Sequence, residues 1–188
     1  MSFPDFLQTL DQRLLLLINR AHTPALDALM TFASNRNVWF PAYLLLAGWL
    51  GWHFRRRALR LLPLLVGAVG LADSITSRLF KPFFGRLRPC HAPALAGRLH
   101  LPDGCGGPFG FLSSHAANSV ALAVFLLLTL PAGRFRALKI GAFVWAALLS
   151  YSRLYLGAHY PTDVLGGAVV GAVLAWGAAA LFKKTTPV

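Results

Sequence analysis

The sequence predicts an all-α integral membrane protein, and three observations support this fold class. Of the 188 residues, 56% are hydrophobic and only 13% are charged. The mean hydropathy of +0.59 is typical of a membrane domain. The hydrophobic residues are gathered in five uncharged runs that short polar segments separate. A chain of this length has the size of one domain, so we assign residues 1–188 to a single domain.

The five uncharged runs predict a bundle of about five membrane-spanning helices over residues 38–182. They are Val38–Phe54, Leu61–Ala72, Ala116–Ala132, Ile140–Ser152 and Val164–Phe182. The last run has the length that a bilayer requires. The second and fourth runs reach that length only if Asp73 and Lys139 lie near helix ends or face the interior of the bundle.

Residues 1–37 are expected to form an interfacial N-terminal segment. Apolar residues recur there at helical spacing, namely Phe6, Leu7, Leu10, Leu14, Leu17 and Ile18. Because Asp11, Arg13 and Arg20 interrupt any long apolar run, Phe3–Ala33 fits an interfacial helix better than a spanning one. A tilted sixth span is the alternative. The apolar core Leu14–Ile18 is too short for a secretory signal, and no small-residue cleavage site follows it.

The distribution of charge predicts how the bundle is oriented. With five spans, one side receives nine of the 18 basic residues and none of the six acids: Arg55, Arg56, Arg57, Arg60, Arg134, Arg136, Lys139, Lys183 and Lys184. That side is expected to be cytoplasmic. The remaining polar clusters then lie on the extracytoplasmic side. Since the basic residues are spread over membrane-flanking loops, the sequence does not indicate a nucleic-acid partner.

The only two cysteines fall in the outward loop Pro82–Leu112. An oxidising compartment would allow Cys90 and Cys105 to form a disulfide. Two unlinked thiols in a mobile loop are one alternative. A metal site made of these cysteines with His91 and His100 is another, although the spacing matches no standard zinc motif.

The first polar cluster is Lys81 with Arg88-Pro89, at the expected end of a helix. Arginine offers a planar fork to phosphate oxygens and lysine a point charge, so the two together indicate a phosphate site. Cations at a helix end can also extend to the membrane surface without binding anything. That second interpretation is the one we give to Arg78 and Arg86.

The second and third clusters also lie at helix ends. Ser113 and Ser114 precede an apolar run, so they are expected at a helix N-cap, where backbone N–H groups can hold an anion. A cationic His115 in that first turn is unfavourable unless an anion compensates it. Further along, Ser152-Arg153 precedes His159, and Asp163 follows in the first turn of a helix that starts near Pro161. A carboxylate beside an imidazole fixes its tautomer, although such a pair can also be an ordinary surface contact.

Taken in order, the three clusters resemble the signature of the type 2 phosphatidic acid phosphatase (PAP2) superfamily. That signature reads Lys-x6-Arg-Pro, then Pro-Ser-Gly-His, then Ser-Arg-x5-His-x3-Asp. The first and third motifs match at Lys81–Pro89 and Ser152–Asp163, and the five-span layout looks most like the small bacterial undecaprenyl diphosphate phosphatases. The second motif departs, because Leu112 replaces the proline and Ser114 the glycine. A serine keeps its backbone N–H, so we expect activity to survive.

The resemblance implies a metal-independent lipid phosphatase that needs no cofactor. His159 would be the nucleophile that forms a phosphohistidine, Asp163 would orient it, and His115 would be the acid. The phosphoryl oxygens would be held by Lys81, Arg88, Arg153, Ser113 and Ser114. The chain has six Asp and no Glu, with no cluster of carboxylates that could hold a hard cation.

The expected partners are the bilayer and a lipid phosphate whose headgroup lies at the extracytoplasmic face of a bacterial inner membrane. Undecaprenyl diphosphate is our first expectation. Phosphatidic acid, phosphatidylglycerophosphate and lipid A are alternatives. A haloperoxidase-like oxidoreductase shares these phosphate-site motifs, but in soluble proteins. A non-enzymatic membrane scaffold would instead use Gly167-x-x-x-Gly171 as a helix-packing face.

Overall fold

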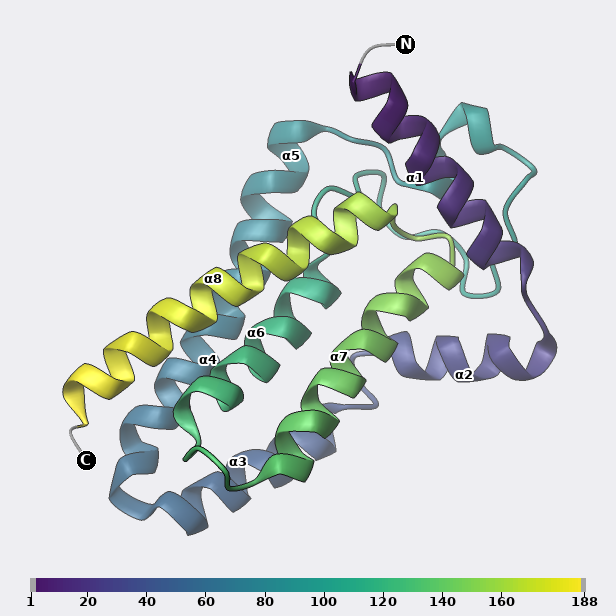
Figure 1. Ribbon diagram of the computed structural model, residues 1–188. Helices are drawn as coiled ribbons and strands as arrows, with labels where there is room; N and C mark the ends of the chain where they lie inside the picture. Colours follow the sequence, from purple (N-terminus) through teal and green to yellow (C-terminus); the bar gives the residue numbers. More distant parts are fainter. Residues whose placement is uncertain (1–2, 187–188) are drawn as a thin grey trace.

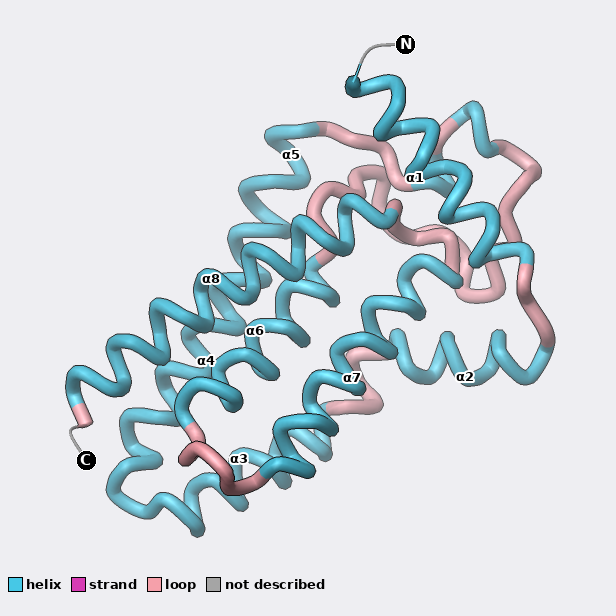
Figure 2. Tube along the Cα trace, in the orientation of Figure 1, coloured by secondary structure: helices cyan, strands magenta, loops and turns pink. Residues whose placement is uncertain are grey.

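The protein is an all-helical bundle in a computed structural model that describes residues 3–186 (Figures 1 and 2). The main helices are α1 (Phe3–Arg20), α2 (Pro24–Ser34), α3 (Phe40–Phe54), α4 (Ala58–Ser74), α5 (Lys81–Phe84), α6 (Ser114–Thr129), α7 (Arg136–Tyr155) and α8 (Pro161–Thr185). A π-helical stretch, Ile75–Phe80, continues α4 into α5. Each of the five predicted runs is a helix, namely α3, α4, α6, α7 and α8, so the expected all-α bundle is confirmed.

Helix α6 lies at the centre of the bundle and contacts α4, α7 and α8 (Figure 1). Its closest neighbour is α8, because Gly167 and Gly171 let the two backbones approach. A Cβ atom on Gly171 would collide with the carbonyl oxygen of Ala117, and one on Gly167 with that of Ser113. The Gly-x-x-x-Gly pair therefore serves packing within this chain.

The outer surface of the bundle is apolar. Leu45, Leu59 and Val66 on α3 and α4 are 75%, 77% and 69% exposed, and Trp176 on α8 is 65% exposed. Two helical stretches, Phe40–Phe84 and Pro161–Thr185, are long and apolar enough to cross a membrane, and Ser114–Thr129 is a shorter apolar helix. An exterior of this kind is what lipid contact requires. The count of five crossings stays a prediction.

The N-terminal segment forms two helices where the sequence led us to expect one. The chain breaks before α2 because the hydroxyl of Thr23 accepts a hydrogen bond from the Leu26 N–H and Pro24 occupies the first helical position. Helix α1 lies across one end of the bundle (Figure 1). It leaves Phe6, Leu10, Leu14 and Leu17 exposed and buries Asp11, Leu15, Leu16 and Asn19. An apolar face is thus open to a membrane surface.

The two ends of the bundle are built differently (Figure 1). The first, the loop end, carries α1, α2, the long segment 85–113 and the connection from α7 to α8. The second, the cationic end, carries the turn Arg55–Arg57, the connection from α6 to α7 and the end of α8. The nine cations predicted to be cytoplasmic belong to the cationic end. All three polar clusters of the sequence belong to the loop end.

Candidate active site

A cavity of about 760 Å³ opens at the loop end of the bundle. Six of the predicted site residues line it: Lys81, Arg88, Ser114, His115, Arg153 and His159. Two others, Ser113 and Asp163, are fully buried behind its wall. Three segments that are far apart in the sequence thus meet at one cavity.

The three predicted phosphate-binding cations, Lys81, Arg88 and Arg153, reach the cavity from different elements, and Arg36 and Arg78 also line it. Lys81 is the first residue of α5, and its Nζ donates a hydrogen bond to the Ser114 hydroxyl at 3.3 Å. Arg153, near the end of α7, donates through Nη1 to the hydroxyl of Ser34, while its buried Nε has no hydrogen-bond acceptor in the described chain. A buried N–H without an acceptor is costly, so this nitrogen is suited to an anion that enters the cavity.

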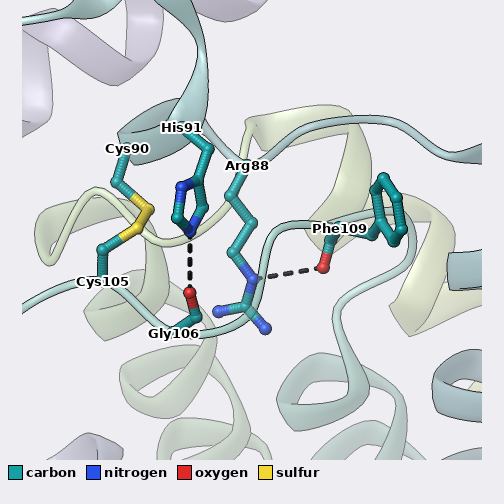
Figure 3. The surroundings of a disulfide bond; sticks show 6 residues. All are labelled: Arg88, Cys90, His91, Cys105, Gly106 and Phe109. Carbon is teal, nitrogen blue, oxygen red and sulfur yellow. Dashed lines mark hydrogen bonds between the residues drawn. A yellow bond between two sulfur atoms is a disulfide. The ribbon is translucent and has the colours of Figure 1, made fainter.

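Arg88 is held by the long segment that surrounds it (Figure 3). Its Nε donates to the Phe109 carbonyl at 3.1 Å, and its backbone N–H donates to the Pro108 carbonyl at 2.8 Å. Next to it, Cys90 and Cys105 form a disulfide, and His91 Nε2 donates to the Gly106 carbonyl at 2.8 Å. The disulfide thus holds together the two stretches of the segment, near residues 90 and 105, that lie beside this arginine.

The alternative metal site of four ligands does not assemble in the described chain. The ligand atoms of Cys90, His91 and Cys105 lie within 4.8 Å of one another, but the two sulfurs are bonded together. His100 lies elsewhere, because its Nε2 is 2.9 Å from the Asp27 carboxylate. The cysteines therefore form a structural disulfide in the segment that carries Arg88.

His159 and Asp163 form a buried pair at the start of α8. His159 Nδ1 lies 3.5 Å from Asp163 Oδ2, with side chains 2% and 0% exposed. The same carboxylate oxygen accepts the Tyr160 backbone N–H at 2.9 Å, which caps the helix. Burial lowers the pKa of His159 to about 4, and the nearby Asp163 carboxylate opposes this shift without reversing it. The imidazole is thus neutral near pH 7, with Nδ1 toward the carboxylate and Nε2 left for the cavity.

Comparisons with known proteins agree with this geometry. A model of the PAP2 superfamily matches residues 60–187. The chain belongs to the PAP2 superfamily. A lipid A 4'-phosphatase of Bacteroides thetaiotaomicron is 37% identical over 92% of this chain and 76% of that protein. The undecaprenyl-diphosphatase BcrC of Bacillus subtilis is 29% identical over 81% of this chain and 73% of that protein.

Among solved structures, a transmembrane PAP2-type phosphatidylglycerolphosphate phosphatase from Bacillus subtilis superposes with a TM-score of 0.70. It is 25% identical, and the match covers 96% of this chain and 88% of that one. The chain is therefore a PAP2 lipid phosphatase and a membrane protein.

In the second motif of this PAP2 phosphatase, Ser113 is held by hydrogen bonds within the protein. Ser113 caps α6, since its hydroxyl accepts the Ala116 N–H at 3.4 Å, and its own N–H donates to the Asp163 carbonyl at 3.0 Å. The hydroxyl of Ser113 still has its own hydrogen to donate, so its phosphate contact stays a prediction. Ser114, which replaces the family glycine, lines the cavity and lies 2.9 Å from the Thr76 hydroxyl.

Arg86 is a residue that the sequence interpretation missed, because we had assigned it only to the membrane surface. Its Nη1 lies 2.6 Å from Asp163 Oδ1, and its Nη2 lies 2.6 Å from Asp11 Oδ2. Its guanidinium also stacks 4.3 Å over the ring of Tyr160. Burial alone would lower its pKa, but the two carboxylates outweigh that effect and raise it. Arg86 thus bridges α1 to the carboxylate that faces His159.

Ser34, the last residue of α2, was also missed. Its carbonyl accepts a hydrogen bond from His115 Nε2 at 3.1 Å, and its hydroxyl accepts one from Arg153. One buried serine therefore orients two cavity residues. Nothing in the local sequence around Ser34 signals this role, because both contacts depend on where α2 packs against α6 and α7.

Proposed function

We propose that this PAP2 phosphatase transfers a phosphoryl group from a membrane lipid to His159 and then to water. The observation that carries the proposal is the imidazole of His159, backed by the buried Asp163 carboxylate, in a cavity that Lys81, Arg88 and Arg153 also line. A loose phosphoryl transition state is stabilised mainly by positioned positive charge and donors. Lys81, Arg88 and Arg153 supply that charge, and Ser114 supplies a further donor.

In the first step, His159 Nε2 attacks phosphorus, and the bond from phosphorus to the lipid oxygen breaks. The anionic phosphate of the bound substrate favours the protonated form of His115, which gives its proton to that leaving oxygen. The products are the dephosphorylated lipid and a phosphohistidine, whose positive imidazole is stabilised by Asp163. Because the Ser34 carbonyl can only accept, His115 Nε2 carries a proton, and Nδ1 is the nitrogen that exchanges one with the substrate.

In the second step, a water molecule gives a proton to His115 and its oxygen bonds to phosphorus. The bond between phosphorus and His159 breaks, which releases inorganic phosphate and restores the neutral nucleophile. His115 is protonated again and ready for another substrate. Neither step calls for a metal ion, since the three cations stabilise the charge that Mg²⁺ stabilises in other phosphoryl-transfer sites.

The substrate we favour is the phosphate of lipid A. The supporting observation is the 37% identity to a lipid A 4'-phosphatase over nearly the whole chain. Undecaprenyl diphosphate, our expectation from the sequence, is the second candidate, and the similarity to BcrC supports it. Either lipid places its phosphate at the membrane surface and its tails beside the apolar helices. We also propose that the loop end faces the extracytoplasmic side of a bacterial inner membrane, opposite the cationic end.

The test is phosphate release by the purified protein in lipid nanodiscs, with lipid A, undecaprenyl diphosphate, phosphatidic acid and phosphatidylglycerophosphate as separate substrates. We expect turnover that persists in EDTA, and an acid-labile phosphoryl group that maps to His159 in rapidly quenched samples. Chelator-sensitive turnover would contradict the metal-free mechanism. Turnover without any phosphohistidine would contradict the role of His159, and no turnover on any lipid would refute the proposed function.

A further inference from the structure

A second polar group lies in the cavity, below the residues assigned to phosphate. Asp73 on α4 and Asn118 on α6 both line the cavity and contact each other, since Asn118 Nδ2 donates to Asp73 Oδ1 at 2.9 Å. Asn118 comes one helical turn after Ser114, and Asp73 comes two turns before Lys81 along a continuous helical stretch. The pair is therefore set about one turn, ~5.4 Å, deeper than the phosphate site.

The cavity changes character along its depth. Its outer part is cationic, its middle carries Asp73 and Asn118, and its deeper wall includes Val69, Leu65 and Leu122. A substrate that fits all three levels has a phosphate, then a polar group, and then an apolar tail. Neither residue of the middle level belongs to the three motifs that indicated a phosphatase.

The hydrogen-bonding capacity of the pair is unfilled. Asn118 Oδ1 is buried and has no hydrogen-bond partner in the described chain. Asp73 is exposed, and its carboxylate accepts one hydrogen bond from the described chain, that of Asn118, although a carboxylate can accept about four. An ionisable side chain in an apolar bundle is costly and is usually retained for function. Both open positions are acceptors, so they require a ligand that donates.

We propose that Asp73 and Asn118 bind the hydroxyl or amide N–H groups of a sugar that carries the reacting phosphate. This inference rests on the proposed function and narrows its substrate class to phosphorylated glycolipids. A sugar ring presents such donors beside its phosphate, at the depth of the middle level. Undecaprenyl diphosphate would instead place its second phosphate there, where the Asp73 carboxylate repels it.

A competing role for Asp73 is as the counter-ion of Lys81, which feels its charge. The two roles predict different outcomes. A counter-ion acts on every phosphate substrate alike, because Lys81 contacts the group they share. A sugar contact acts only on substrates that have the sugar. Comparing two lipids in the same variant therefore separates the roles.

The experiment measures kcat/KM for lipid A and for undecaprenyl diphosphate with the nanodisc protein and two variants, Asp73→Asn and Asn118→Leu. Each lost hydrogen bond to a charged or buried group corresponds to a loss of roughly tenfold to 100-fold. We expect a fall of that size on lipid A in both variants. In Asp73→Asn we also expect undecaprenyl diphosphate turnover to rise, so that the ratio of the two constants shifts by at least about tenfold. The matched control is Asp5→Asn, in the first turn of α1 and outside the cavity.

Equal losses on both lipids in either variant would overturn the proposed sugar contact. So would a wild-type protein that cleaves undecaprenyl diphosphate and not lipid A, although the proposed phosphatase function would survive that result. A wild-type protein inactive on every lipid would refute the function itself. Thermal unfolding of each variant checks folding, and because the two residues lie on different helices, a fold defect in one variant leaves the other to decide.

Discussion

The two ends of the bundle both carry cations, and within residues 3–186 the cavity that gathers the polar clusters is the one at the loop end. At the cationic end, Arg55, Arg56 and Arg57 are exposed to solvent. At the loop end, Arg88 and Arg153 are each anchored by a neighbouring oxygen and directed at one cavity. Exposed charges are screened by water and by mobile ions, whereas fixed charges in a partly dry cavity act on a ligand directly. Fixed geometry, rather than the number of cations, therefore produces a phosphate site.

Two neighbouring arginines at the loop end also differ in what they contact. Arg86 and Arg88 are two residues apart, but Arg88 lines the cavity while Arg86 turns away to bridge Asp11 and Asp163. One is placed to hold substrate and the other to hold the carboxylate behind the nucleophile. The same residue type thus serves two purposes within one short segment.

The largest effect is expected at the nucleophile. His159→Ala removes the atom that attacks phosphorus, so we expect turnover to fall by at least about 10³-fold. Phosphate release in nanodiscs measures this loss, and an unchanged elution profile and unfolding temperature show that the bundle is intact. Residual activity near the wild-type level would mean that another group attacks phosphorus.

A substantial but smaller loss is expected at Arg86. Arg86→Ala removes the cation that contacts both Asp163 and Asp11, although Asp11 keeps its hydrogen bonds from Thr162 and Asp163 keeps that from Tyr160. Loss of a supporting contact of this kind is expected to cost about 10- to 100-fold in activity. Because Arg86 acts through Asp163, kcat should fall more than KM rises. Arg86→Lys restores only the charge, so it should recover part of the activity. A variant that raised KM alone would instead place Arg86 on the substrate.

The dependence on pH tests the environment of His159. Its pKa is about 4 in the folded protein and near 6.5 when unfolded, because burial disfavours the charged ring. The nucleophile therefore stays neutral down to about pH 4, and the acidic limb of kcat/KM should lie nearer pH 4 than pH 6.5. Between those values the unfolded chain binds more protons, so stability is full above pH 6.5 and decreases as the pH falls toward 4. An acidic limb centred near pH 6.5 would show that the imidazole is exposed.

The smallest effect is expected at the cationic end. Arg56→Ala removes an exposed charge from the end opposite the cavity, and kcat/KM on any lipid phosphate should stay within about twofold of the wild type. The same assay measures it, with orientation in the membrane followed separately by labelling. A loss like that of Arg86→Ala would show that the two ends are coupled and would undo the comparison.

The sequence by itself determined the helices and the local geometry of the motifs. Apolar runs predict helices because a buried or lipid-facing stretch must satisfy its own backbone. Asp163 lies beside His159, and Ser113 caps α6, because each relation spans only a few residues at a helix start. Local residues also determine the break between α1 and α2, because Thr23 and Pro24 start a new helix. The sequence interpretation had nevertheless treated this segment as one helix.

Only the tertiary structure decided which distant residues share a contact. Arg86 and Asp11 are 75 residues apart, and Arg153 and Ser34 are 119 apart. No local pattern specifies such pairs, because they depend on how the helices pack. The same packing brings Asp73 on α4 into contact with Asn118 on α6, and it uses the N–H of Ser113 within the protein. Local chemistry fixed the candidates for the site, and helix packing assigned each its position.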